Sequence, residues 1–328
     1  HKSGVSETTR AHILQIAETL GYPLKNPGEE TSIEAPQNLG LIVKSEPESP
    51  PRANPFYSRI LAGIEDACRR ERINLLYAKM PVDDNNYPVH MPTLLTHEDL
   101  KGLLVVGVFI NDAISPKITN LGIPVILVDA YTLHQDYDAV VSDNFSGAYA
   151  AVNYLIEKGH RHIGILGGCQ SSYPSLQERR RGYEKALQDQ GIQQTYLTRC
   201  ALQPEAALDA TRELLEEHPQ ITALFGCNDE VAIAAIHAAR EVGRHVPEDI
   251  SIIGYDDIDF AQYTTPPLTT MHVDKVMMGQ EAVRLLYWRL EHPDAVRMTV
   301  TVHSPLVERG SVIPYYKLAR SLSKKAEG

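Results

Sequence analysis

The sequence has little of what several common classes of protein require. Its 328 residues contain no apolar run near the ~20 residues that a membrane-spanning helix needs, which excludes a transmembrane span. The four cysteines, Cys68, Cys169, Cys200 and Cys227, are far apart and form no C-x-x-C pair, so neither a zinc site nor a disulfide framework is indicated. This use of cysteine favours a reducing cytoplasm as the location.

Basic side chains are also scarce. Lys and Arg total 31 against 42 Asp and Glu, which gives a formal net charge of −11. Residues 1–27 hold three basic and two acidic side chains, so residues 28–328 carry −12. An acidic body of this kind repels a phosphate backbone. Any contact with nucleic acid must therefore come from a separate basic module.

Residues 6–20 predict one helix, and a linker follows it. Ser6 is a suitable N-cap, Gly21 stands where a C-cap glycine belongs, and Pro23 blocks continuation. Between them, apolar residues recur at i, i+3, i+4 and i+7, which places them on one face. A single helix cannot bury such a stripe alone, so we expect it to pack on other helices or on a partner. Residues 23–38 are polar and rich in proline, which is typical of a linker.

Beyond residue 38, short β-branched runs alternate with amphipathic helices. The predicted strands are 39–43, 73–78, 102–109, 124–129, 139–142, 162–167, 221–227 and 250–255. The helical segments include 57–68, 175–190, 204–217 and 229–242. Near-continuous apolar strands are buried on both faces, which is typical of parallel sheets covered by helices. Two rounds of the pattern, in a chain long enough for about two domains, predict an α/β fold with two doubly wound lobes.

The last part of the sequence continues this pattern. A strand-like run at 268–273 and a helix at 275–292 follow the second round, and the strand-like runs 298–303 and 306–307 come after them. In sheets of this kind, binding sites form at the carboxyl ends of the strands. Two lobes that face each other would therefore create a binding cleft between them.

Several motifs, taken together and in order, resemble the lactose-repressor (LacI/GalR) family of transcription regulators. Residues 5–22 resemble the last helix of the family's DNA-binding headpiece. Further matches to its sensor domain are 54–57 (NPFY), 123–129 (IPVILVD), 142–144 (SDN), 159–163 (GHRHI), 179–183 (RRRGY), 227–229 (CND), 254–257 (GYDD) and 265–270 (TPPLTT). Each motif alone is weak, but their joint order from residue 5 to about 310 is specific.

The resemblance implies two periplasmic-binding-protein-like lobes joined by crossover strands and preceded by a headpiece helix. The helix-turn-helix of the family would precede residue 1, and the stretch after Gly21 and Tyr22 lacks the Ala-Arg-x-Leu element of the family's hinge helix. The implied parts are a truncated headpiece at 1–22, the linker at 23–38, a first lobe at 39–143 plus 271–300, a second lobe at 144–270 plus 301–313, and a tail at 314–328.

Arg179 is the leading candidate for a binding residue. It opens a run of three arginines, and such a run is usually a solvated helix face. Only Arg179, however, stands three residues before Gly182, where the resembled family points an arginine into the cleft. A guanidinium is a rigid fork of donors that suits vicinal hydroxyls or a carboxylate.

Polar residues that end predicted strands supply further candidates. Asp256 and Asp257 could work as an acid–base pair, but neither a nucleophile nor a metal cluster accompanies them. The resemblance instead makes Asp256 an acceptor for ligand hydroxyls and turns Asn228 toward the ligand, whereas Asp257 and Asp229 are expected to be structural. The remaining ligand candidates are Asp129, Asp143, Phe56, Ser175 and Leu202. Phe56 is preferred over Tyr57, which belongs to the apolar stripe of its helix.

Metal and nucleotide binding are not expected. His160 and His162 could share one face of a strand, but two histidines without a third ligand are more often structural. Gly167 and Gly168 follow a strand, yet no phosphate-binding motif comes after them. No cofactor is therefore predicted.

These observations favour a cytoplasmic transcription regulator. A small molecule, a sugar or sugar derivative by preference and a purine or an acidic sugar as alternatives, would bind between the lobes of a homodimer. It would control the binding of operator DNA by a headpiece mostly outside this sequence. A periplasmic-type sugar-binding protein of the same fold is the alternative function. An enzyme is disfavoured because no triad, P-loop or metal spacing is present, and no membrane partner is expected.

Overall fold

The structure is a computed structural model that describes residues 37–45, 54–83, 87–133, 136–169, 173–198 and 202–317. The predicted headpiece helix, almost all of the linker and most of the tail lie outside these residues. The described residues from Asn38 onward form one compact unit. Among the described residues, no helix is both long enough and apolar enough to cross a membrane.

The first lobe is built on a parallel sheet of six strands in the order β13-β7-β5-β3-β1-β2. Its strands are β1 (Asn38–Ser45), β2 (Asn74–Pro81), β3 (Leu100–Val106), β5 (Val125–Val128), β7 (Asp138–Ser142) and β13 (Thr299–Val302). Helices α2 (Pro55–Arg70) and α8 (Lys275–Glu291) share a core with one face. The other face packs on η1 (Thr93–Thr96) and α3 (Ser115–Thr119). Strands β4 (Phe109–Ile110) and β6 (Tyr131–Thr132) form a separate small pair.

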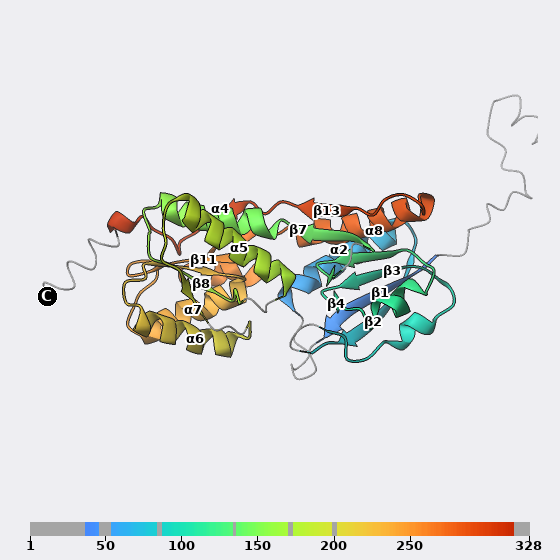
Figure 1. The fold of residues 1–328 in the computed structure, drawn as a ribbon, viewed down its shortest axis with the longest axis horizontal. Helices are drawn as coiled ribbons and strands as arrows, with labels where there is room; N and C mark the ends of the chain where they lie inside the picture. Colours follow the sequence, from blue (N-terminus) through green and yellow to red (C-terminus); the bar gives the residue numbers. More distant parts are fainter. Residues whose placement is uncertain are drawn as a thin grey trace, which may run out of the picture. The chain divides into compact units, whose positions relative to one another are not determined.

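The second lobe is built on another sheet of six strands, in the order β14-β12-β11-β10-β8-β9, of which only β14 is antiparallel. Its strands are β8 (Ile163–Leu166), β9 (Tyr196–Leu197), β10 (Ala223–Gly226), β11 (Ser251–Asp256), β12 (Thr269–His272) and β14 (Leu306–Val307). Helices α4 (Asn144–Glu157) and α5 (Pro174–Asp189) share a core with one face. Helices α6 (Pro204–Glu217) and α7 (Asp229–Glu241) cover the other, and η2 (Asp259–Tyr263) follows β11 (Figure 1).

The predicted fold class is confirmed, because the described residues form two doubly wound α/β lobes. Short elements such as α3 and β9 were not predicted, and two larger differences have a clear physical reason. The strand expected at 102–109 ends at Val106, because Gly107 adopts φ +73° and turns the chain. Helix α4 was not among the predicted helices, since its apolar residues surround much of its circumference and give little of the amphipathic pattern.

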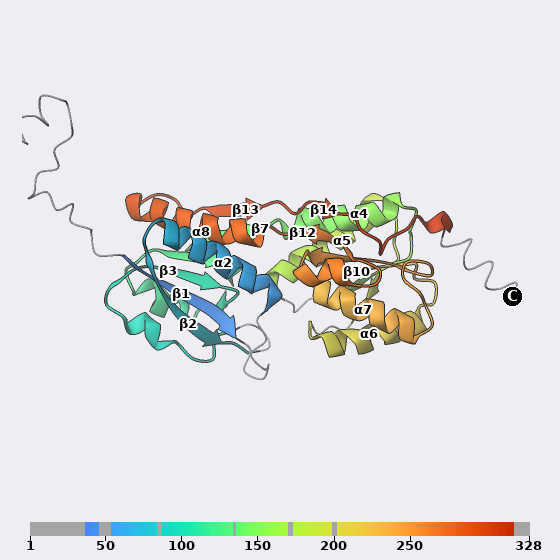
Figure 2. The same ribbon diagram turned by 180° about the vertical axis from the view of Figure 1, so that it is seen from behind.

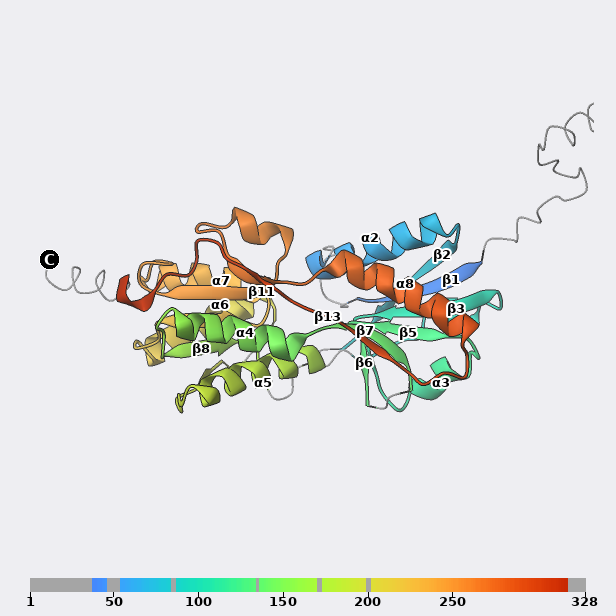
Figure 3. The same cartoon turned by 90° about the horizontal axis from the view of Figure 1, so that it is seen from above.

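Three segments connect the lobes (Figure 3). The chain passes from β7 to α4 at Asp143, from β12 to α8 after His272, and from β13 to β14 after Val302. The last two points fall two residues beyond the expected boundaries at 270 and 300. The segments are hydrogen-bonded to one another, because the Asp143 amide donates to the Val302 carbonyl (2.8 Å) and the His272 amide donates to the Pro305 carbonyl (2.7 Å). The connecting segments are therefore held together by backbone hydrogen bonds.

Among the described helices, four begin with a side-chain cap. Asn54 accepts the amides of the first turn of α2, and Asp143, Asn228 and Asp274 do the same for α4, α7 and α8. An Asn or Asp at this position satisfies amides that have no partner within the helix. Three of these caps stand one or two residues after the end of a strand, so helix amino ends lie at the carboxyl edges of both sheets.

Helices α2 and α8 lie side by side and meet at two glycines (Figure 2). A Cβ on Gly63 would stand 2.1 Å from the Val276 carbonyl oxygen, and one on Gly279 would stand 2.2 Å from that of Ile60. Both positions lack space for any side chain, so the two backbones approach as closely as glycine allows.

The Gly279→Ala variant tests this packing. In a solvent-exposed helix, this substitution would stabilise the folded protein by about 1 kcal/mol. Here the added methyl meets backbone, so we expect the free energy of unfolding to fall by about 1–3 kcal/mol, as measured by urea denaturation. Ala62→Ser, on the exposed face of α2, is the control and should change little. A stabilised Gly279→Ala variant would contradict the close approach.

Candidate functional site

Two buried carboxyl groups mark the carboxyl edges of the two sheets. Asp129 follows β5 in the first lobe, and Asp256 ends β11 in the second; 5% and 6% of their surfaces are exposed. Both adopt a positive φ, +45° for Asp129 and +107° for Asp256. Such backbone angles are unfavourable for residues other than glycine and are found where a site fixes the chain.

Arg179 is buried between these elements with 4% of its surface exposed. Its Nε donates to Asn144 Oδ1 (2.8 Å), and its NH1 donates to the carbonyl oxygen of Cys227. Its NH2 lies 3.0 Å from Asp256 Oδ1, and the guanidinium carbon lies 3.8 Å from the centre of the Tyr255 ring. Groups from α4, β11 and the end of β10 therefore fix one guanidinium, in agreement with the inward position expected for Arg179.

The pKa values of Arg179 and Asp256 depend on one another. Burial raises the pKa of Asp256, and Arg179 and Lys275 lower it. Burial lowers the pKa of Arg179, but Asp256 and Asp129 raise it, and the net shift is upward. The contact between Arg179 and Asp256 Oδ1 lacks hydrogen-bond geometry, so this buried oxygen has no hydrogen-bond partner among the described residues. An unused acceptor beside a fixed guanidinium is suited to a hydroxyl, which can donate to one and accept from the other.

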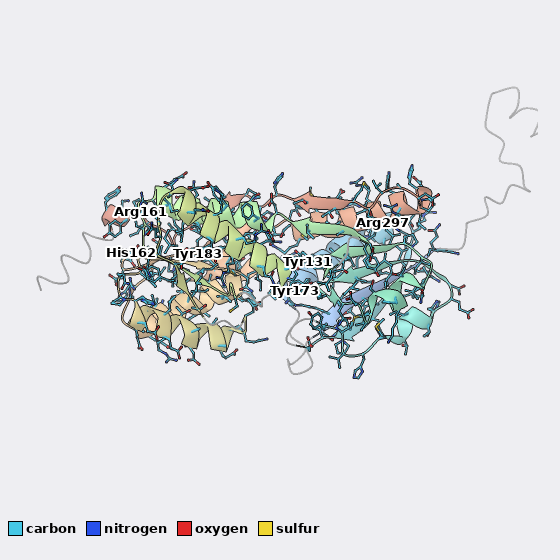
Figure 4. All side chains as sticks on the ribbon, in the orientation of Figure 1. Tyr131, Arg161, His162, Tyr173, Tyr183 and Arg297 are labelled. Atoms are coloured by element: carbon cyan, nitrogen blue, oxygen red, sulfur yellow. The ribbon has the colours of Figure 1, made fainter. Side chains whose placement is uncertain are left out.

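Tyrosines from both lobes surround Asp129. The Tyr57 hydroxyl donates to its Oδ2 (3.0 Å), and the Tyr131 hydroxyl lies 3.4 Å from its Oδ1. Tyr173, which precedes α5 of the second lobe, donates its hydroxyl to the Asp129 carbonyl oxygen (3.0 Å). Its ring also packs edge-on against that of Tyr131, with centroids 5.1 Å apart (Figure 4). Burial raises the pKa of the Asp129 carboxyl to about 6, although Arg179 and the Tyr57 hydrogen bond oppose the shift.

Two lysines reach the same region. Lys275, at the start of α8, donates its ammonium to the carbonyl oxygens of Asp256, of Asp257 (3.1 Å) and of Val273 (3.0 Å). It therefore joins the first helix after the crossing to the end of β11. The buried ring of Phe56 lies 6.0 Å from this ammonium. The Lys44 ammonium, at the end of β1, lies 5.3 Å from the centre of the Tyr57 ring.

Asn228 and Asp143, two of the predicted ligand residues, cap helices. Asn228 Oδ1 accepts the Val231 amide (2.8 Å), and Asp143 Oδ1 accepts the Ser146 amide (3.0 Å). In the motif of residues 142–144 it is the next residue, Asn144, that binds Arg179. Asp143 and Asn228 thus cap helices beside Asn144 and Cys227, the two hydrogen-bond partners of Arg179, and their functional role stays a prediction.

Asp229 and Asp257 have structural partners. Asp229 is fully buried and accepts from the Thr270 hydroxyl (2.5 Å) and the Ile258 amide (2.8 Å). Asp257 accepts from His272 (2.8 Å) and Arg309 (2.6 Å). Both sets of contacts agree with the structural role expected for these aspartates.

Ser175 and Leu202 have different surroundings. Ser175 is buried in the first turn of α5, four residues before Arg179 and hence on the same face of that helix. Leu202 is 36% exposed, and its Cδ2 lies 3.3 Å from where a Cβ on Gly167 would stand. Ser175 therefore lies on the face of α5 that carries Arg179, and Leu202 lies near Gly167, just beyond the carboxyl end of β8.

The histidines of the motif 159–163 have unrelated partners. His160 contacts Thr222 Oγ1 (3.0 Å) and the Ile313 carbonyl oxygen (3.0 Å), whereas His162 contacts the Tyr196 hydroxyl (2.8 Å). Within the described ranges, no group of three or more His, Cys, Asp or Glu side chains is arranged to hold a metal ion.

Sequence reasoning missed several members of the site. Tyr57 belongs both to the apolar stripe of its helix, as predicted, and to the candidate site. Its ring is buried, while its hydroxyl reaches Asp129. Asn144 belongs to the motif of residues 142–144, but the neighbouring Asp143 was predicted as the ligand residue. Tyr131, Tyr173 and Lys44 belong to no motif singled out in the sequence, so only their position in the fold identifies them.

Comparison with known protein families gives a match over the second half of the chain. The family described as "Periplasmic binding protein-like domain" matches residues 152–312. The HTH-type transcriptional repressor PurR of Haemophilus influenzae is 30% identical over 293 residues, which cover 88% of this chain and 84% of the repressor. The PurR of Mannheimia succiniciproducens is 28% identical and covers 94% of this chain and 91% of its own length.

Solved structures resemble most of the chain. A LacI family transcriptional regulator from Enterococcus faecium, solved with bound ribose, superposes with a TM-score of 0.72 at 27% sequence identity. The similarity covers 85% of this chain and 99% of that one.

The raised pKa of Asp129 makes a prediction for stability. Because the folded chain binds this proton more tightly than the unfolded chain, the Asp129 carboxyl destabilises the fold as pH rises from about 4 through about 6. The total loss in the free energy of unfolding is about 3 kcal/mol. In urea denaturation, the free energy of unfolding of Asp129→Asn minus that of the parent should therefore rise by about 3 kcal/mol between pH ~4 and pH ~7.

The exposed Asp99→Asn is the matched control and should give a difference from the parent that is independent of pH. If Asp129→Asn also differs from the parent by a constant amount, the carboxyl titrates normally and the burial argument is wrong.

Proposed function

The chain belongs to the LacI/GalR family of transcription regulators, and on this premise we propose that it is a regulator whose two lobes bind a small effector. The family is one of regulators and not of enzymes. In the proposal, the effector is a sugar or sugar derivative held between the lobes. Its binding alters the affinity of the full-length protein for operator DNA in the cytoplasm.

The observation that carries this proposal is the buried group of Arg179, Asp256 and Asp129. A fixed fork of donors beside two carboxyl groups is complementary to neighbouring hydroxyls, which both donate and accept. The ribose held by the Enterococcus faecium regulator supports the same class of ligand. A regulator solved as a CelR–cellobiose complex, with a TM-score of 0.71 and 25% identity, gives further support; it covers 94% of this chain and 92% of its own.

The proposed mechanism couples the effector to the angle between the lobes. Phe56, Tyr57 and Asp129 belong to the first lobe, whereas Arg179 and Asp256 belong to the second. An effector that touches both sets favours one relative orientation over another. It shifts the equilibrium only by its difference in affinity for the two states, and couplings of about 1–3 kcal/mol are typical.

Exposed aromatic side chains support a homodimer as the acting unit. Phe260 and Tyr263 on η2 are 69% and 75% exposed, and Tyr77 on the edge strand β2 is 50% exposed. Aromatic side chains are enriched in the cores of protein interfaces. In the proposal, a second copy covers them, and the two headpieces then reach operator half-sites about one helical turn apart. A transport protein has no use for a headpiece-like helix, which favours the regulator over a periplasmic-type sugar-binding protein.

Effector binding is tested by comparing two arginines of α5. A thermal-shift screen of carbohydrates and nucleobases identifies a ligand, and calorimetry then measures its affinity for each variant. Arg179→Lys keeps the charge and loses the fork, so we expect affinity to fall at least ~10-fold, the effect of about 1.4 kcal/mol. Arg181→Lys changes an arginine that is two-thirds exposed and should bind as the parent does. Equal affinities would remove Arg179 from the site.

Dimerisation is tested by placing a charge on the exposed aromatic surface. We expect Tyr263→Arg to shift the sedimentation coefficient from dimer to monomer, because an unpaired charge in an interface must lose its hydration. Val296→Arg, at an 82% exposed position between α8 and β13, is the control and should leave the dimer intact. A Tyr263→Arg protein that sediments as the parent does would contradict an interface at η2.

A further inference from the structure

Asn144 stands at the first connection between the two lobes. It is the first residue of α4 and follows Asp143, at which the chain passes from β7 into the second lobe. Only 5% of its surface is exposed. A buried side-chain amide needs partners for both its donor nitrogen and its acceptor oxygen. The partners of Asn144 therefore identify the groups that this connection holds together.

Four hydrogen bonds use the full capacity of this amide. Its Nδ2 donates to the Tyr131 hydroxyl (3.2 Å) and to the Ser142 carbonyl oxygen (3.1 Å). Its Oδ1 accepts from Arg179 Nε (2.8 Å) and from the Ser142 hydroxyl (3.1 Å). The amide can take only this orientation, because a guanidinium only donates and a carbonyl oxygen only accepts. Asn144 thus turns its oxygen to Arg179 of the second lobe and its nitrogen to Tyr131 of the first.

The hydrogen bonds continue into the first lobe in the same direction. Because the Tyr131 hydroxyl accepts from Asn144, it can donate its own proton to Asp129 Oδ1, which lies 3.4 Å away. The Tyr131 ring packs edge-on against Tyr173 of the second lobe, so its position depends on the contact between the lobes (Figure 4). One chain of donors and acceptors therefore leads from Arg179 through Asn144 to Tyr131.

We propose that Asn144 is a positioning residue, which holds Arg179 in its effector-binding orientation only while Tyr131 of the first lobe is in contact. The inference rests on the proposed function and adds how the angle between the lobes reaches the guanidinium. When the lobes separate, Asn144 loses its bond to Tyr131, and its side chain gains freedom to turn about its torsions. Arg179 then loses a fixed acceptor, so the site binds an effector tightly only when the lobes are closed.

The Nε–H proton of Arg179 reports this coupling without an effector. Its nuclear magnetic resonance signal is assigned by comparison with Arg179→Lys, and its exchange with solvent is measured at constant pH. Tyr131→Phe keeps the ring and removes the hydroxyl to which Asn144 donates. We expect the exchange of the Arg179 proton to become about fivefold faster, the factor that one neutral hydrogen bond contributes. If the bond between Asn144 and Tyr131 only supported the fold, this proton would exchange as in the parent.

Tyr137→Phe is the matched control. Tyr137 is a buried tyrosine of the same lobe, and its hydroxyl contacts those of Ser115 and Thr119 on α3, each at 3.0 Å. Its removal should lower the melting temperature and leave the exchange of the Arg179 proton unchanged. Equal acceleration in Tyr137→Phe and Tyr131→Phe would make general loosening of the lobe the cause and overturn the proposal. Unchanged exchange in Tyr131→Phe would overturn it as well.

Asn144→Ala identifies the route of the coupling. The exchange of the Arg179 proton should rise in this variant, because the guanidinium loses one acceptor, and adding Tyr131→Phe should change it no further. If Tyr131 acted through the Asp129 carboxyl instead, its hydroxyl would still matter in the Asn144→Ala protein, and Asn144 would lose the assigned role. Should Asn144→Ala fail to fold, unchanged exchange in Tyr131→Phe alone still overturns the proposal.

Failure of this coupling is distinguishable from failure of the proposed function. If a ligand binds with an Arg179-dependent affinity and the Arg179 proton does not respond to Tyr131→Phe, the effector site remains and only the role of Asn144 falls. If the proton responds but no ligand depends on Arg179, the coupling between the lobes remains and the proposed effector site falls.

Discussion

The buried guanidinium of Arg179 is the constraint around which the second lobe is organised. A guanidinium with 4% exposure must be compensated, and here the Asn144 side chain and the Cys227 carbonyl accept its hydrogen bonds, while the Asp256 carboxyl faces it as a counter-ion. Each partner depends on its own strand or helix being in place. The guanidinium therefore connects correct assembly of the lobe to the chemistry of the site, because a misplaced element would leave a charge or a carbonyl unpaired in the interior.

Aromatic hydroxyls from both lobes converge on Asp129 of the first lobe. Tyr57 and Tyr131 direct their hydroxyls to Asp129, and Tyr173 crosses from the other lobe to the same residue. Asp129 is thus the point at which the lobes meet chemically. Helices α2 and α8, which meet closely at Gly63 and Gly279, pack on the sheet from whose strand β5 Asp129 extends. Contacts that hold the site also hold the orientation of the lobes, which is a suitable arrangement for a sensor.

The fold was largely predictable because its signals are local. Apolar strands such as 162–167 and 221–227 and striped helices such as 204–217 follow from spacing alone, and the structure contains all of them. Helix α4 escaped because it is apolar around most of its circumference. Arg179 and Asp256 were found only through a resemblance of motifs, since an arginine in a run of three gives no local sign of burial.

By itself, the sequence determined the α/β class, the two lobes and the strand ends at which polar residues gather, since backbone periodicity and burial act over short stretches. Only the tertiary structure decided which of those polar residues face one another. Lys44 and Tyr173 are more than a hundred residues apart and come from different lobes, and each is unremarkable in its own segment. Electrostatic and aromatic contacts depend on distance in space, and a linear pattern carries no measure of that distance.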